Sequence, residues 1–412
     1  MALLQDDPQA SPVAGQPARE TPGTPRAEQQ VTDPATAPAG TEPLSAAEPA
    51  PAAEPLLEQA RALLAVHPVA DGHNGLAWAL RSVPWSDIEL GESSLDTDIP
   101  RLRAGGVGAQ FWSLHTTAAR HTPAKDTAAG TGPAEGTAAA AEAGSGPCPV
   151  ALTLEQIDRV LAMVRSHPEG LRLALNAGEV GDARSCRRIA SLLGPAQAAA
   201  LGDSLGTLRS LHTLGVRCVT LSGTAWARPT GLTRFGQEVV REMNRIGMLA
   251  DLSGAGAETA RDALGVTKAP VIFTRSGASA LTDHPANVPD DILSALRDNG
   301  GLCMVPLAAD RTGPSVAAVA DHLDHVRALA GADCVGLSGT YDTGAGHPAG
   351  LADTACYPLL IAELLGRGWP EADLARLTWG NFQRVLRDAE FTARAAQQRR
   401  GPSTARIEEM DG

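Results

Sequence analysis

Short apolar runs alternate with amphipathic stretches along most of this chain. Most of the apolar runs are bounded by glycine, and the stretches that follow them, such as DSLGTLRSLHTLG and FGQEVVREMNRIG, have apolar residues at helical spacing. Repeated strand–helix units of this kind predict a parallel sheet. The predicted strands are 69–73, 108–113, 171–176, 189–194, 216–223, 248–253, 270–275, 302–307 and 334–339.

The number of strand–helix units favours a closed barrel over an open, doubly wound sheet. About eight units in roughly 330 residues match a (β/α)8 barrel of the TIM type. No G-x-G-x-x-G follows the first run, which weakens a dinucleotide-binding interpretation. We therefore predict an α/β barrel over residues 56–400, with its functional residues at the carboxyl ends of the strands.

Three segments depart from this pattern. Residues 1–55 are rich in Ala, Pro and Glu and have almost no large apolar side chains, so we predict a disordered tail. Residues 118–147 have a similar composition and are predicted to form a flexible surface insertion. Residues 401–412 are assigned to a C-terminal tail.

Composition and charge narrow the possible functions. The chain has 412 residues, 43% of them hydrophobic, and a net charge of −13, which argues against nucleic-acid binding. Its six cysteines form no C-x-x-C pair, which suggests buried thiols in a reducing compartment. The sequence shows neither a secretory signal nor an apolar run of the ~18 residues that a membrane span needs. We expect a cytoplasmic protein with no membrane span.

The residues at the predicted strand ends offer few metal donors. The stretch VADGHNGLAW places His73 at the end of the first strand, but Gly75 follows two positions later, where a second ligand would point the same way. A zinc hydrolase needs His, Asp and Glu at these ends. The other strand ends carry Trp112, Ala196, Gly223, Gly254, Arg275 and Thr340.

Long collinear motifs resemble the membrane (renal) dipeptidase family, including its soluble bacterial members. They include DGHNGLAWALR, TDIPRLRAGGVGAQFWS, FGQEVVREMNRIGMLADLS, APVIFTRS, NVPDDIL, YPLLIAELLGRGW and GPSTARIEEMDG, and the resemblance covers residues 56–412. It implies a (β/α)8 barrel that hydrolyses dipeptides at two zinc ions, and a possible homodimer.

When the family's site residues are matched to this sequence position by position, one metal ligand remains. His73 matches a family zinc ligand, but Gly75 stands where the family has the second aspartate. The family's metal-bridging glutamate corresponds to Ala196, and its substrate-binding arginine to Ala286. The remaining histidine and aspartate positions of the family site hold Gly223, Gly254, Arg275 and Thr340.

This set of residues argues against a zinc pair. Glycine and alanine side chains donate no ligand, and a guanidinium 4 Å from a cation costs roughly 4 kcal/mol per unit charge at an effective dielectric near 20. We therefore expect no resident cofactor and a protein that has lost zinc-dependent dipeptide hydrolysis, with a binding or regulatory role toward an unknown small molecule or protein partner. The alternative is an active metallodipeptidase whose zinc binding is weakened or rearranged.

The sequence allows two roles each for Arg275 and His73. Arg275 either binds an anion in the barrel mouth or pairs internally with Asp342 or Asp251. Asp342 is a candidate because it lies two residues after Thr340, on the same face of a continuing strand. His73 is either a metal ligand or a strand-end histidine satisfied by the backbone or by Asp71.

The remaining histidines suggest no replacement site. His322 and His325 in DHLDH are expected on an amphipathic helix outside the barrel, in a solvated or capping role. His115 and His121 flank the predicted insertion without a carboxylate partner at ligand spacing. The sequence contains neither H-E-x-x-H nor Gly-x-Ser-x-Gly, so neither a zincin nor a serine-hydrolase site is supported.

Overall fold

The computed structural model describes residues 54–83, 87–91, 94–116 and 147–412. The predicted tail, 1–55, lies outside the described residues except for Glu54 and Pro55, which begin helix α1. The predicted insertion, 118–147, lies outside them except for Pro147.

Eight parallel strands close into a barrel, which confirms the predicted fold. In ring order the strands are β1, β2, β4, β5, β8, β9, β10 and β11, and β11 pairs again with β1. Strand β3 lies outside the ring and pairs with the first half of β4. The bounds are β1 (Val69–Asn74), β2 (Val107–Leu114), β3 (Leu171–Leu173), β4 (Ile189–Gln197), β5 (Cys218–Thr220), β8 (Leu249–Asp251), β9 (Ile272–Phe273), β10 (Leu302–Pro306) and β11 (Val335–Ser338), with a hairpin of β6 (Ala227–Arg228) and β7 (Gly231–Leu232).

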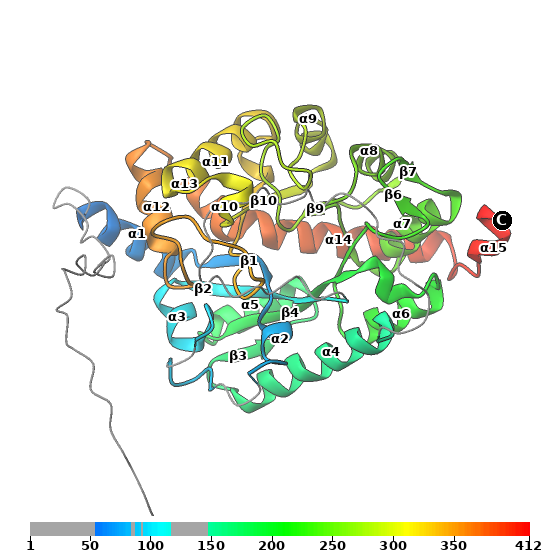
Figure 1. The fold of residues 1–412 in the computed structure, drawn as a ribbon, viewed down its shortest axis with the longest axis horizontal. Coiled ribbons are helices and arrows are strands. Elements are labelled where there is room, and N and C mark those ends of the chain that lie inside the picture. The colour runs from blue at the N-terminus through cyan, green and yellow to red at the C-terminus, as the bar shows by residue number, and fades with distance from the viewer. Residues whose placement is uncertain (1–53, 84–86, 92–93, 117–146) are drawn as a thin grey trace, which may run out of the picture. The chain divides into compact units, whose positions relative to one another are not determined.

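Helices surround the barrel (Figure 1). Their ends follow ordinary capping chemistry: Thr233 Oγ1 accepts from the Gly236 N–H at the start of α7, and Gly247 ends that helix in a left-handed conformation. The helices are α1 (Glu54–Val66), α2 (Leu76–Ala79), α3 (Ile99–Ala104), α4 (Pro149–Ser166), α5 (Ala177–Ser185), α6 (Leu205–Thr213), α7 (Arg234–Ile246), α8 (Ala257–Val266), α9 (Asp290–Asn299), α10 (Ala309–Thr312), α11 (Val316–Ala330), α12 (Tyr357–Gly366), α13 (Glu371–Ala375), α14 (Asn381–Arg399) and α15 (Ile407–Asp411).

Two apolar cores hold these layers together. The larger core lies mainly between the strands and the outer helices. The smaller one joins barrel residues such as Phe111 and Leu192 to Phe382 and Leu386 of α14, and the Phe111 and Phe382 rings meet edge to face at 5.5 Å. No helix in the described ranges is long and apolar enough to cross a membrane.

The segment assigned to a C-terminal tail contains helix α15. Its Asp411 accepts from the Phe235 N–H (3.1 Å) and the Thr233 hydroxyl (2.5 Å) at the start of α7. Asp411 therefore caps a helix that lies far away in sequence.

Asp411→Ala is expected to lower the free energy of unfolding by about 1 kcal/mol, because it leaves one N–H of the first turn of α7 without its cap. Denaturant unfolding of the full chain measures this. Glu409→Ala, an exposed change on the same helix, is the control. Equal losses in the two variants would show that the cap contributes nothing.

Candidate functional site

The carboxyl ends of β1, β2, β9, β10 and β11 surround a cavity of about 230 Å³. This is the end at which TIM barrels carry their functional groups. The polar side chains that line it are His73, His115, Arg275, Asp310, Arg311, Thr340 and Thr343.

Arg275, which follows β9, connects these strand ends. Its Nη1 lies 3.4 Å from Asp251 Oδ2, 3.2 Å from Thr274 Oγ1 and 3.5 Å from His73 Nδ1. Asp251, at the end of β8, is fully buried and also accepts from Ser253 and from Thr274. Of the two carboxylates considered as partners for Arg275, the structure therefore brings Asp251 to it.

The cavity offers further donors for an anion. Among the described residues, Arg275 Nε and Nη2 have no hydrogen-bond acceptor. Arg311 of α10 adds a second guanidinium, and its Nη1 donates to the Arg275 carbonyl oxygen at 3.0 Å. Guanidinium groups bind carboxylates and phosphates through charge-assisted hydrogen bonds. The arrangement is therefore suited to a small organic anion.

His73 is a neutral imidazole in this setting. Burial lowers its pKa well below the ordinary value, and the charges of Arg275, His115 and Arg311 lower it further. Since Arg275 Nη1 can only donate, His73 Nδ1 faces it as an acceptor. The neutral ring can then donate from Nε2.

His115 lies beside His73, with the two rings edge to face at 5.5 Å. Its Nε2 is 2.8 Å from Ser113 Oγ, and that hydroxyl donates to the Asn74 carbonyl oxygen. His115 Nε2–H is therefore assigned as the donor to Ser113. The sequence interpretation placed His115 beside the insertion and missed this position in the mouth. Its place directly after β2 was the signal that could have found it.

The space beside Gly75 is filled by the backbone. A Cβ on Gly75 would lie 2.3 Å from the Asp342 carbonyl oxygen, and the Gly75 N–H donates to the Tyr341 carbonyl oxygen. Gly223 and Gly254 differ from Gly75 in this respect. Both have positive φ, and a Cβ on either would meet no atom within 4 Å.

The other positions offer little to a ligand. Ala196 is fully buried in β4, opposite Val219 of β5, and presents only a methyl group. Ala286 lies in a loop where its N–H donates to His284 Nδ1. Thr340 lines the cavity, but its hydroxyl donates to the Gly339 carbonyl oxygen.

These residues do not fit a pair of zinc ions. In the described ranges, no three His, Cys, Asp or Glu side chains are grouped so that they could hold a metal ion. A zinc pair needs a bridging carboxylate. Asp71 does not line the cavity, and its Oδ1 accepts from the His73 and Gly339 N–H groups; the carboxylate that lines the cavity is Asp310. We derive no catalytic step through a metal from this arrangement.

Asp342 takes a different position from the one expected. It has a left-handed backbone conformation (φ 56°), and its Oδ1 accepts from the Asp96 N–H at 2.9 Å. The turn directs the carboxylate to the loop before α3, so Asp342 neither pairs with Arg275 nor lines the cavity.

His322 is not solvated, which corrects the sequence interpretation. It is buried, its Nδ1 accepts from the Ala278 N–H at 2.9 Å, and its Nε2 lies 3.1 Å from Thr282 Oγ1. Helix α11 packs against the loop after β9, and His322 supplies hydrogen-bond partners for the Ala278 N–H and the Thr282 hydroxyl of that loop. His325 lies at the surface and contacts Asp290.

The sequence also missed a group of three ionisable side chains beside the mouth. The Asp96 carboxylate contacts His347 Nε2 at 3.5 Å and accepts from the Asp342 N–H at 3.0 Å. Burial, and then the charge of Asp96, raise the pKa of Asp342 to about 7. Burial opposes the charged form of His347, but its contacts with Asp96 and Leu307 raise its pKa overall.

Comparisons with known proteins identify relatives over most of the chain. The family model described as membrane dipeptidase (peptidase family M19) matches residues 57–400. Dipeptidase 3 of Mus musculus is 38% identical over 358 residues, which cover 81% of this chain and 67% of that protein. Dipeptidase aclJ of Aspergillus oryzae is 37% identical over 353 residues, covering 80% and 79%.

A solved structure agrees with these matches. The metallopeptidase of Rhodobacter sphaeroides, liganded with a phosphinate mimic of the dipeptide L-Ala-D-Ala, is 25% identical, with a TM-score of 0.69 over 78% of this chain and 99% of that one. The strand order, the family match and the curated relatives lead to one conclusion. The chain belongs to the membrane dipeptidase family, peptidase family M19.

Proposed function

We propose that this chain has lost zinc-dependent dipeptide hydrolysis and binds a small organic anion in the mouth of its barrel. One observation carries the proposal: the Arg275 guanidinium lies against Nδ1 of His73. His73 is the one zinc-ligand position at which the family resemblance still finds the expected residue. A guanidinium is never deprotonated in proteins, so it opposes a cation at this place and attracts an anion.

The class of ligand follows from the donors in the cavity. Arg275 and Arg311 supply two guanidinium groups, while Asp310 is the carboxylate among the lining residues. A molecule with one carboxylate, phosphinate or phosphate group matches these donors. The Rhodobacter relative was solved with a phosphinate mimic of L-Ala-D-Ala, so L-Ala-D-Ala and that mimic are suitable probes.

The second candidate function is metal-dependent dipeptide hydrolysis. The observation in its favour is membership of a family whose curated relatives are named dipeptidases. Glycine or alanine at the other ligand positions opposes it, since these residues have no donor atoms in their side chains.

The deciding experiment measures zinc content and hydrolysis on one preparation. The full chain is purified without a metal-binding tag from zinc-supplemented medium, and zinc is quantified per chain. Hydrolysis of L-Ala-D-Ala is then followed with and without a chelator. We expect zinc close to zero and no chelator-sensitive cleavage. Zinc near two per chain together with chelator-sensitive turnover would overturn the proposal.

Arg275→Gln is expected to weaken binding of the L-Ala-D-Ala phosphinate mimic about tenfold or more, because it removes a charge-assisted contact. Isothermal titration calorimetry measures this. Arg387→Gln, an exposed change of the same charge on α14, should leave affinity within about twofold. Equal affinity in Arg275→Gln and the unaltered chain would exclude Arg275 as the anion contact.

A further inference from the structure

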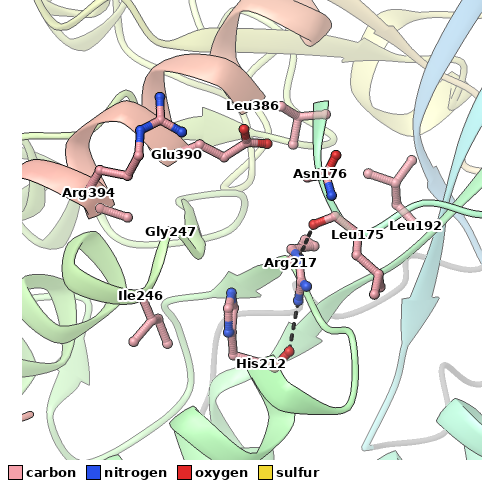
Figure 2. A pocket seen from close by; sticks show the side chains of 11 residues that line it. Leu175, Asn176, Leu192, His212, Arg217, Ile246, Gly247, Leu386, Glu390 and Arg394 are labelled. Carbon is pink, nitrogen blue, oxygen red and sulfur yellow. Dashed lines mark hydrogen bonds between the residues drawn. The ribbon is translucent and has the colours of Figure 1, made fainter. Parts of the chain in front are cut away.

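A second cavity, of about 340 Å³, lies near the amino ends of β5 and β8, beneath α14 (Figure 2). It is remote in the fold from the mouth, because Arg217 precedes β5 and Gly247 precedes β8, whereas the mouth is formed after the strands end. Polar and apolar side chains both line it. Neither the family resemblance nor the comparisons assign it a role.

Arg217 is a half-buried cation without a carboxylate partner. Its Nε donates to the Leu175 carbonyl oxygen, and its Nη1 donates to the carbonyl oxygens of His212 (2.8 Å) and Val216 (2.9 Å). Within the described residues, Nη2 has no acceptor and the guanidinium forms no ion pair. Three backbone contacts therefore fix the guanidinium, while its charge is left without a counter-ion.

Glu390 of α14 faces Arg217 across the opening (Figure 2). Its Oε1 accepts from the Ala177 N–H at 2.6 Å, in the first turn of α5, and its Oε2 has no donor among the described residues. Burial lowers the pKa of Arg217, and the charges of Glu179 and Glu390 oppose that shift. The two groups therefore interact electrostatically without forming an ion pair.

Apolar side chains lie between these charges. Leu192 of β4 and Leu386 of α14 are buried, and Ile246 at the end of α7 is half-buried. The neighbouring His212 carries no charge at neutral pH, because burial and the charge of Arg217 lower its pKa to about 4. Arg394, one turn after Glu390 on α14, adds an exposed guanidinium at the edge of the cavity (Figure 2). The cavity thus presents one guanidinium fixed by backbone contacts, a second that is exposed, one carboxylate oxygen and an apolar wall.

We propose that this cavity binds a free α-amino acid with an apolar side chain. The carboxylate would contact Arg217 Nη2, the ammonium would contact Glu390 Oε2, and the side chain would pack on Leu192, Ile246 and Leu386. A zwitterion contacts the fixed Arg217 guanidinium and the Glu390 carboxylate at once, which neither a simple anion nor a simple cation does. The assignment is independent of the function proposed for the mouth.

Calorimetric titration of the full chain with three probes tests the ligand class. L-Leucine carries both charged groups, 4-methylpentanoate lacks the ammonium, and 3-methylbutylamine lacks the carboxylate. We expect L-leucine to bind about tenfold or more tightly than either analogue. No heat with L-leucine, or equal affinity for 4-methylpentanoate, would overturn the assignment.

Two variants locate the binding. Glu390→Gln keeps an oxygen for the Ala177 N–H but removes the charge, so affinity for L-leucine should fall about tenfold. Asp388→Asn, two residues away on the exposed side of α14, is the matched control and should change it less than twofold. Unchanged affinity in Glu390→Gln would overturn the proposal.

Ile246→Trp fills the cavity and should abolish binding, whereas Arg275→Gln, at the other end of the barrel, should leave it unchanged. Binding of L-leucine that survives Ile246→Trp or is lost in Arg275→Gln would place the amino acid elsewhere. Circular dichroism of each variant confirms that it is folded before titration.

Discussion

Gly75→Asp is expected to destabilise the protein by about 3 kcal/mol or more and not to restore metal binding. A Cβ at this position would lie 2.3 Å from the Asp342 carbonyl oxygen and 2.8 Å from its carbonyl carbon. Both are backbone atoms, so no side-chain rotation relieves the overlap, and overpacking of this kind is costly. Denaturant unfolding and zinc content per chain measure the two parts of the prediction.

Two further variants separate the overlap from the charge. Gly75→Ala introduces the same Cβ without a carboxylate and should lose nearly as much stability. Gly254→Ala has open space around its Cβ and a φ of 69°, so its cost should be limited to the left-handed conformation, about 1 kcal/mol. If Gly75→Asp unfolds at the denaturant concentration of the unaltered chain, the backbone beside Gly75 is not fixed as the structure shows.

These three glycines differ in the space around them, which the family resemblance alone does not report. In the sequence, Gly75, Gly223 and Gly254 look alike, since each occupies a position where the resemblance implies a donor. In the structure, Gly223 and Gly254 leave open space, whereas Gly75 touches the segment after β11. A pairwise resemblance reports which side chain is missing but not whether neighbouring backbone occupies its space.

The fold was predictable because short apolar runs, their glycine boundaries and the amphipathic stretches that follow them are local signals. All nine predicted runs contain strands, and eight of them form the closed ring. The observed β5, β8 and β9 are shorter than predicted, since hydrogen bonding to neighbouring strands, and not apolar character, decides where a strand ends. Strand β3 was predicted as a strand, but its place outside the ring depends on pairing that no local pattern reports.

The site was predictable only in part. Arg275 could be placed at a strand end, and its structural partner Asp251 was one of two carboxylates considered. His115 and Arg311 were not anticipated in the mouth, because their position there depends on how the loops after β2 and β10 fold. The contact of Asp96 with Asp342 joins residues 246 positions apart, a separation at which one sequence carries no pairing signal.

Asp342→Asn is expected to stabilise the protein at pH 8 by roughly 2–4 kcal/mol and to have little effect at pH 4. The pKa of Asp342 is about 7 in the folded chain, against an ordinary value of 3.8, with burial as the largest cause and the charge of Asp96 second. The folded state therefore holds a proton between about pH 4 and 7 that the unfolded state has released. The stability that this proton on Asp342 contributes is complete below pH 4 and is lost as the pH rises through 7.

The asparagine amide matches the protonated form at every pH. Its oxygen can accept from the Asp96 N–H, and its nitrogen replaces Oδ2, which has no partner among the described residues. Unfolding of both proteins at pH 4, 6 and 8 should show the gain growing with pH. Asp298→Asn, at an exposed position, is the control and should shift stability equally little at each pH.

Part of the pH dependence should remain in Asp342→Asn. Burial also raises the pKa of Asp71 to about 6, so stability should still fall as the pH rises from 4 to 6 in the variant. A gain that is the same at pH 4 and pH 8 would mean that Asp342 is ionised in the folded chain throughout this range. In that case the carboxylate beside Asp96 would have to be neutralised by His347, whose imidazole lies 3.5 Å from Asp96.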